Sequence, residues 1–186
     1  LIERLILHEG KRIVLFAPKG AKEGVWEPHL QDWLPHIGGG ADFSNLAVFS
    51  QTDLNRKGEF PERFRRIAEL ADVFIIDEAH HFRNPGTRGG DEVGDEGDED
   101  KRSRYFRLYD LLDDTERPKT LYMLTATPIN NRLADFRHMA ELFTRGDEAY
   151  FGRTLGINNL RAHFNGLERA LGKLLGDDVL DVSESL

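Results

Sequence analysis

Residues 73–81 are Val-Phe-Ile-Ile-Asp-Glu-Ala-His-His, an apolar run that ends in two carboxylates and two imidazoles. A short apolar run bounded by polar residues is typical of a strand that is buried on both faces of a parallel sheet. In open α/β sheets, ligands bind at the carboxyl ends of the strands. The stretch therefore predicts a buried parallel strand that presents Asp77 and Glu78 at the edge where ligands bind.

Short apolar runs of this kind recur along the chain and alternate with helical patterns. The predicted strands cover 12–17, 45–50, 72–76 and 120–124. The amphipathic stripes that predict helices cover 1–6, 25–34, 60–71, 105–112 and 133–143. This alternation predicts an α/β fold with a mostly parallel sheet and helices on both of its faces.

The composition excludes several classes of protein. Of the 186 residues, 39% are hydrophobic and 31% are charged, which excludes a membrane bundle and a disordered chain. The longest apolar run, residues 13–17, is far shorter than the ~20 residues that a transmembrane helix needs. The absence of cysteine excludes a disulfide framework and a thiolate metal site, and it fits a reducing, cytoplasmic location.

The net charge of −8 is concentrated in one segment. Residues 91–100 hold seven of the 33 acidic residues, so the rest of the chain has 25 basic residues against 26 acidic ones. The overall charge therefore does not argue against a nucleic-acid partner, because local patches decide such contacts. The acidic, glycine-rich stretch at about 84–101 is predicted to be a flexible insertion, and no function is assigned to it.

A second polar stretch follows the last predicted strand. Residues 124–131 are Leu-Thr-Ala-Thr-Pro-Ile-Asn-Asn, and Pro128 prevents the strand from continuing. Hydroxyl groups at a tight strand exit can bond neighbouring carboxylates or a water molecule. Because the carboxyl ends of parallel strands share one edge, we expect Thr125 and Thr127 to lie beside the acidic pair.

The acidic pair itself allows two interpretations. One carboxylate can hold Mg²⁺ against nucleotide phosphates while the other orients the attacking water. Alternatively, the two acids cap the helix that follows the strand. A metal hydrolase that uses His80 and His81 is disfavoured, because adjacent histidines diverge and the sequence has no His-Glu-x-x-His motif.

Taken in order, these segments resemble motifs of the superfamily 2 DEAH-box helicases and translocases. Residues 77–80, Asp-Glu-Ala-His, match motif II, the Walker B box, and residues 125–128, Thr-Ala-Thr-Pro, match motif III. Residues 17–19 with Val25 and Trp26 resemble motif Ia, and residues 50–54 resemble motif Ib. The chain is most similar to the first RecA-like domain of the Swi/Snf-type branch, especially its bacterial and archaeal members.

The resemblance implies hydrolysis of ATP, with Mg²⁺, coupled to movement on nucleic acid, usually double-stranded DNA in this branch. It implies that Asp77 binds Mg²⁺ through water, that Glu78 activates the hydrolytic water, and that His80 contacts motif III or the nucleotide. Two groups of residues would face other parts of the motor. Thr125, Ala126 and Thr127 would couple the nucleotide state to the nucleic-acid face, and the phosphate backbone would lie near Pro18, Lys19 and Thr52.

The chain also departs from the family pattern. It has no Gly-x-x-x-x-Gly-Lys-Ser/Thr string, because Gly10-Lys11 and Gly172-Lys173 both fail that pattern. We therefore expect a RecA-like domain truncated just after motif I, without the P-loop strand and without the second lobe. In the family that strand neighbours the motif III strand, so residues 120–124 are expected to have an open edge that allows self-association.

The sequence predicts two parts, a partial RecA-like domain over 1–144 and a helical extension over 145–186. In the extension, apolar residues from 157 to 174 recur at spacings of three and four. The isolated chain is expected to be inactive. The alternative function is a degenerate RecA-like module that binds nucleic acid or protein without turnover, for which Arg63, Arg65 and Arg66 could face phosphates or only solvent.

Overall fold

The computed structural model describes residues 1–33, 45–86, 102–113, 117–127 and 133–175. Most of the predicted acidic insertion, residues 87–101, lies outside the described residues. Residues 128–131, which include the proline of the motif III match, also lie outside them.

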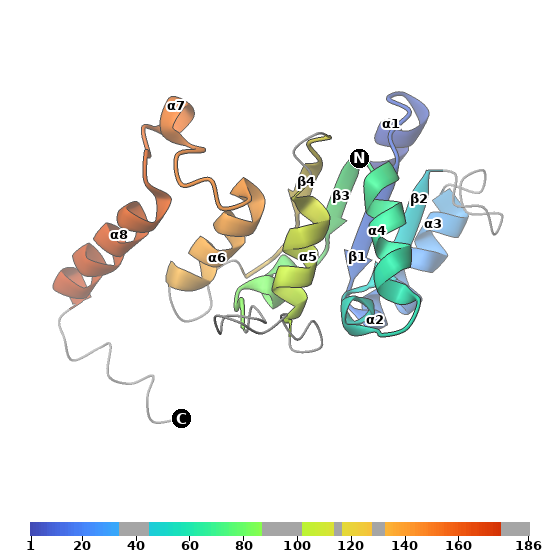
Figure 1. Cartoon of the computed structure of the whole chain (residues 1–186), viewed down its shortest axis with the longest axis horizontal. Coiled ribbons are helices and arrows are strands. Elements are labelled where there is room, and N and C mark those ends of the chain that lie inside the picture. The colour runs from blue at the N-terminus through green and yellow to red at the C-terminus, as the bar shows by residue number, and fades with distance from the viewer. Residues whose placement is uncertain (34–44, 87–101, 114–116, 128–132, 176–186) are drawn as a thin grey trace, which may run out of the picture. The chain divides into compact units, whose positions relative to one another are not determined.

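The described residues form a four-stranded, all-parallel sheet (Figure 1). Its strands are β1 (Ile13–Ala17), β2 (Leu46–Ser50), β3 (Val73–Ile76) and β4 (Thr120–Met123), in the order β2-β1-β3-β4. All four strands predicted from the apolar runs are confirmed, and so is the α/β fold with its parallel sheet. The segment that ends in the acidic pair is an inner strand with a neighbour on each side.

Helical segments connect and follow the strands. They are α1 (Ile2–Leu7), α2 (Lys19–Ala21), η1 (Lys22–Trp26), α3 (Glu27–Trp33), η2 (Gln51–Asn55), α4 (Phe60–Leu70), η3 (Ala79–Phe82), α5 (Arg104–Leu112), α6 (Leu133–Thr144), α7 (Gly152–Leu155) and α8 (Leu160–Leu175). Each predicted helical stripe coincides with one or more of these helices. Over 25–34 the prediction missed η1, a π-helical turn that continues from α2 into α3.

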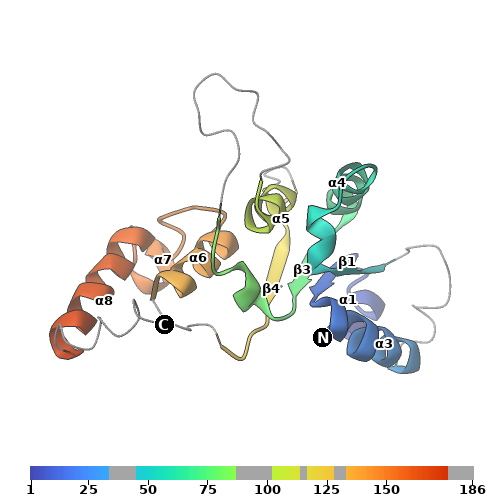
Figure 2. The same cartoon turned by 90° about the horizontal axis from the view of Figure 1, so that it is seen from below.

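Side chains alternate between the two faces of the sheet, and helices cover both faces (Figure 2). On one face, Ile13, Leu15 and Ile75 pack with Leu5 and Ile6 of α1. This face also receives Trp26 and Leu30, from η1 and α3. Successive strand residues point to opposite faces, so the even-numbered residues of β1 and β3 point to the other one.

The other face carries a cluster of phenylalanines. The ring of Phe64, from α4, lies 4.8 Å from that of Phe49 and 6.1 Å from that of Phe16, measured between centroids. Phe16 in turn stacks on Phe74 of β3 at 6.5 Å. Helices α4 and α5 lie on this side of the sheet. Burial on both faces explains why the strands appear in the sequence as continuous apolar runs.

The chain divides into two compact units. The first contains Leu1–Ala79 and Pro85–Ala126, and the second contains His80–Asn84 and Thr127–Leu186. Helix α6, which the sequence analysis assigned to the partial domain over 1–144, belongs to the second unit with α7 and α8. The domain division at residue 144 stays a prediction, because compactness alone does not define an evolutionary domain.

In the second unit, α8 packs against α6. The rings of Phe136 and Phe164 meet edge to face at 5.8 Å, and Glu168 Oε1 accepts a hydrogen bond of 3.1 Å from the backbone amide of Ala134. Ala134 lies in the first turn of α6, where backbone amides have no partner within the helix. The C-terminal apolar stripe thus forms a helix, and its Phe164 is buried while Leu171 is exposed.

None of the described helices has both the length and the apolar composition that are needed to cross a membrane.

Candidate functional site

The acidic pair lies at the carboxyl end of β3. The backbone amide of Asp77 still donates to the carbonyl of Phe16 at 2.8 Å, so pairing with β1 continues one residue beyond the strand. Asp77 and Glu78 are both half-buried. The pair therefore lies where the sequence predicted it, at the edge of the sheet where ligands of α/β proteins bind.

Two hydrogen bonds fix the carboxylate of Asp77. Trp26 Nε1 donates to Oδ2 at 2.7 Å, and the amide of Glu78 donates to Oδ1 at 2.9 Å. Each carboxylate oxygen can accept a second hydrogen bond. The side chain is thus held in one orientation and can still bind a water molecule on either oxygen.

The carboxylate of Asp77 is suited to hold Mg²⁺ through a water molecule, as nucleotide-binding proteins do. Mg²⁺ keeps several waters and takes only one or two protein carboxylates, with nucleotide phosphates as its other ligands. One oriented carboxylate that reaches the ion through water therefore meets this requirement. Among the described residues, no group of three or more His, Asp or Glu side chains could hold a metal ion by protein ligands alone.

Gln51 connects the motif Ib segment to the acidic pair. Its side chain is 2% exposed, and its Nε2 donates to the carbonyl of Asp77 at 2.6 Å. Without the side-chain amide of Gln51, the carbonyl of Asp77 would lose this hydrogen bond, and leaving a buried carbonyl unpaired costs free energy. The sequence analysis gave Gln51 and Trp26 no role of their own, although both lie in segments that it matched to motifs. The sequence held no local signal for the burial of Gln51, because glutamine is usually exposed.

Glu78 has an unusual backbone conformation. Its φ angle is +49°, in the left-handed region that non-glycine residues rarely adopt. Such conformations cost about 1–2 kcal/mol per residue and cluster at functional sites. The turn sets the direction in which the chain leaves β3, directly after the carboxylate of Asp77.

The end of β4 is tied to the end of β3. The amide of Leu124 donates to the carbonyl of Ile76, and the amide of Ala79 donates to the carbonyl of Leu124, each at 2.8 Å. Thr125 follows directly, so the first residue of the motif III match leaves the sheet beside the acidic pair. Ala126 follows it and is exposed.

The residues expected to face nucleic acid follow the other two strands. Pro18 and Lys19 come after β1 and begin α2, and Lys19 is exposed. Thr52 lies in η2 after β2, and it is also exposed. Ser50 caps this turn, where its backbone amide donates to Asp53 Oδ2 at 2.9 Å. All four strands are parallel, so these residues lie along the same edge of the sheet as Asp77.

His80 and Thr127 belong to the second unit, so the structure does not describe how they lie relative to the acidic pair. The rings of His80 and His81 are 4.3 Å apart, centroid to centroid. The predicted roles of both residues stay predictions.

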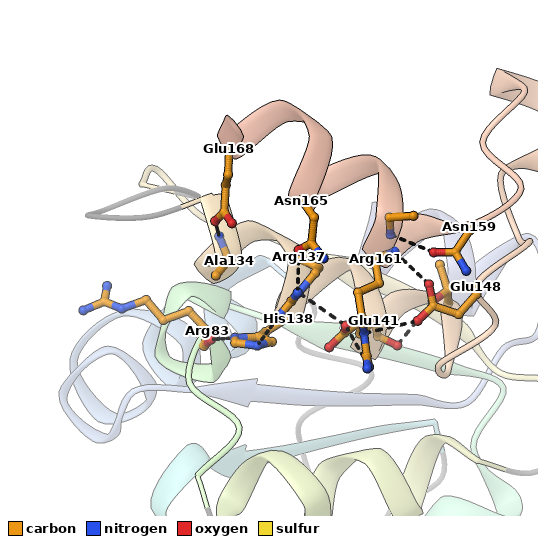
Figure 3. A network of polar contacts seen from close by, with 12 residues as sticks. Arg83, Ala134, Arg137, His138, Glu141, Glu148, Asn159, Arg161, Asn165 and Glu168 are labelled. Carbon is orange, nitrogen blue, oxygen red and sulfur yellow. Dashed lines mark hydrogen bonds and ion pairs between the residues drawn. The ribbon is translucent and has the colours of Figure 1, made fainter. Parts of the chain in front are cut away.

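A polar network in the second unit ties the segment after the acidic pair to α6 (Figure 3). His138 Nδ1 lies 2.8 Å from the carbonyl of Arg83, and His138 Nε2 lies 3.2 Å from Arg137 Nη2. A carbonyl only accepts and a guanidinium only donates, so Nδ1 carries the proton and Nε2 accepts.

The same network continues along α6 to α8. Arg137 Nε lies 3.5 Å from Glu141 Oε1, and both side chains are about four-fifths buried. Arg161 of α8 approaches Glu141 at 3.8 Å and Glu148 at 3.7 Å, but its side chain is 63% exposed. The Arg137–Glu141 pair lies within α6, whereas Arg161 connects α8 to α6 through an exposed contact, which contributes little to stability.

A scan of protein-family models and a search of curated proteins both find no match to this chain.

Proposed function

We propose that this chain is part of the first RecA-like lobe of an ATP-dependent helicase or DNA translocase. One observation carries the proposal: the four segments that resemble motifs Ia, Ib, II and III follow four adjacent parallel strands at one edge of the sheet. Lys19, Thr52, Asp77 and Thr125 mark these four exits.

The chemistry of the residues supports ATP hydrolysis. Bound ATP would supply the phosphoanhydride bond that breaks. Bound Mg²⁺ would supply positive charge that offsets the negative charge developing on the phosphate oxygens. Asp77 would hold a water ligand of the ion, and its orientation is fixed by Trp26 and by the amide of Glu78. Glu78 would orient the attacking water and accept its proton.

The proposed coupling uses the segment after β4. Thr125, Ala126 and Thr127 would transmit the nucleotide state to the nucleic-acid face, and His80 would contact this segment or the nucleotide. The nucleic acid, double-stranded DNA by the family resemblance, would approach Pro18, Lys19 and Thr52. Cations and hydroxyl groups at such positions make sequence-independent phosphate contacts.

The remaining half of the ATP site would come from residues outside this sequence. The chain has no P-loop string, so a P-loop strand paired to the outer edge of β4 would supply the phosphate cradle, and a second lobe would complete the motor. We further propose a cytoplasmic location. By itself the chain should bind Mg²⁺ and ATP weakly and should not hydrolyse ATP.

The test is the ATPase activity of the parent protein with duplex DNA, single-stranded DNA and RNA as separate stimulants. The proposal predicts turnover that increases severalfold with nucleic acid, and most with duplex DNA. Nucleic-acid binding without turnover would instead support the degenerate binding module. Robust turnover by the 186-residue chain alone would contradict the proposed division of the site.

A further inference from the structure

A surface groove lies between α4 and α5 in the first unit, and it also includes Leu54 of η2, the turn after β2. Helix α5 packs against both α4 and η2, and Figure 1 shows α4 and α5 side by side. The groove has a volume of ≈ 160 Å³. It takes no part in the function proposed above.

The floor of the groove is apolar. Leu54, Pro61, Phe64 and Leu111 line it, and of these Leu54 and Phe64 are almost completely buried. An engineered apolar cavity of about 150 Å³ binds benzene, so a space of this size can hold one aromatic ring or one leucine side chain. The floor thus provides a place for a single apolar group.

The remaining lining residues are charged, and most are positive. Arg65 comes from α4, Arg102 from the segment just before α5 and Arg107 from within α5, and Asp110 is the one acidic residue among them. The cations therefore outnumber the acid by two, on a chain whose net charge is −8. Such a local patch attracts anions whatever the overall charge.

Existing contacts hold these arginines in place. Arg102 Nη2 lies 2.6 Å from Asp110 Oδ1, and Arg107 Nε donates to the carbonyl of Arg102 at 3.0 Å. Arg65 Nη1 lies 3.0 Å from Glu62 Oε2. Guanidinium groups that are already positioned lose less conformational entropy when they bind a ligand.

One buried donor in this cluster has no acceptor. Arg102 Nε is buried and makes no hydrogen bond to any residue in the described part of the chain. Buried polar groups in native proteins are nearly always paired, so such an atom calls for an explanation.

We propose that this groove binds an acidic peptide segment of a partner protein that carries one apolar side chain. The apolar side chain occupies the floor over Phe64 and Leu111. The flanking carboxylates pair with Arg65, Arg102 and Arg107, because carboxylates match the planar geometry of guanidinium groups.

The floor favours a peptide over nucleic acid as the ligand. A sugar-phosphate backbone has no apolar side chain to place over Leu54, Pro61 and Phe64, so these contacts would be lost. The groove is also short, whereas a nucleic-acid backbone is followed by an extended row of cations.

The test uses the 186-residue chain and a fluorescein-labelled peptide, Asp-Asp-Leu-Glu-Asp, with binding followed by anisotropy. Arg65→Gln should weaken binding by about fivefold or more, because one charge-assisted contact is lost. Arg66→Gln is the matched control: Arg66 also pairs with Glu62, at 3.2 Å, and is exposed, but it does not line the groove. The affinity of the Arg66→Gln variant for the peptide should stay within about twofold of that of the unchanged chain.

Two further arms test the floor and the class of ligand. Replacing the peptide's leucine with glycine should weaken binding by about tenfold, because the apolar group is removed. Equal losses for Arg65→Gln and Arg66→Gln, or no effect of the glycine peptide, would overturn the proposal. A labelled DNA duplex that binds more tightly than the peptide, with the same dependence on Arg65, would overturn it in favour of a nucleic-acid surface.

Discussion

The indole nitrogen of Trp26 donates a hydrogen bond of 2.7 Å to Oδ2 of Asp77, which lies 51 residues further along the chain. This bond joins η1, which follows the first strand in sequence, to the carboxylate at the end of β3. It leaves the side chain of Asp77 with one orientation at the edge of the sheet. The proposed Mg²⁺ ligand is therefore positioned before any nucleotide binds.

We expect Trp26 and Asp77 to be energetically coupled. Trp26→Phe removes the donor but keeps an aromatic ring, and Asp77→Ala removes both acceptor oxygens. In a double-mutant cycle by urea denaturation, the coupling free energy should be about 1.5 kcal/mol, at the low end for a hydrogen bond to a charged group because this one is only partly buried. Additive effects of the two substitutions would show that the bond does not stabilise the fold.

Gln51→Leu should destabilise the chain, because it leaves the carbonyl of Asp77 without its 2.6 Å hydrogen bond in a buried position. The expected loss is about 1–3 kcal/mol in the free energy of unfolding. Thr52→Val changes the next residue, which is exposed; it removes only the 2.8 Å hydrogen bond between the hydroxyls of Thr52 and Ser50 and should cost less than about 1 kcal/mol. If both variants unfold at the same urea concentration, Gln51 has no special part in holding the acidic pair.

Glu78→Gly should make the chain more stable. Glycine removes the cost of a left-handed φ of +49°, and after its own entropy cost the net gain is about 0.5–1 kcal/mol. Glu78→Gln keeps the backbone cost, so its unfolding free energy should stay close to that of the original chain. A glycine variant that is less stable than the glutamine variant would show that no strain is stored at this position.

The fold could be predicted from the sequence because buried parallel strands leave a simple signal. The four runs 12–17, 45–50, 72–76 and 120–124 each gave a strand within one or two residues of its observed bounds. The acidic pair could also be placed, since chain direction alone puts Asp77 and Glu78 at the carboxyl end of β3. The helical patterns located α6 and α8 but not the contact between them, because periodicity identifies a buried face and not what covers it.

Other parts of the site depend on contacts that local patterns do not encode. The bond from Trp26 to Asp77 and the bond from Gln51 to the same residue connect segments that meet only after the strands have paired. The positive φ of Glu78 follows from how the chain turns after β3, and glutamate gives no local signal for it. The identity of Gln51 as a buried residue was equally hidden, because glutamine is usually exposed.

The open edge of β4 leads to a prediction about self-association. In the described part of the chain, β4 pairs only with β3, and unpaired edges recruit strands from other molecules. Thr120 is exposed at the start of β4, so Thr120→Lys should reduce concentration-dependent association in sedimentation experiments. Thr154→Lys makes the same charge change at an exposed position in α7 and should leave association unchanged. A chain that stays monomeric at all concentrations would contradict this expectation.

The central claim is that Glu78 activates the water that attacks ATP, and Glu78→Gln in the parent protein tests it most directly. The amide keeps the size and hydrogen-bonding reach of the side chain but cannot accept the proton. The account predicts ATP binding within about twofold of the original affinity and single-turnover hydrolysis slowed by at least about 100-fold. Hydrolysis at the original rate would contradict it.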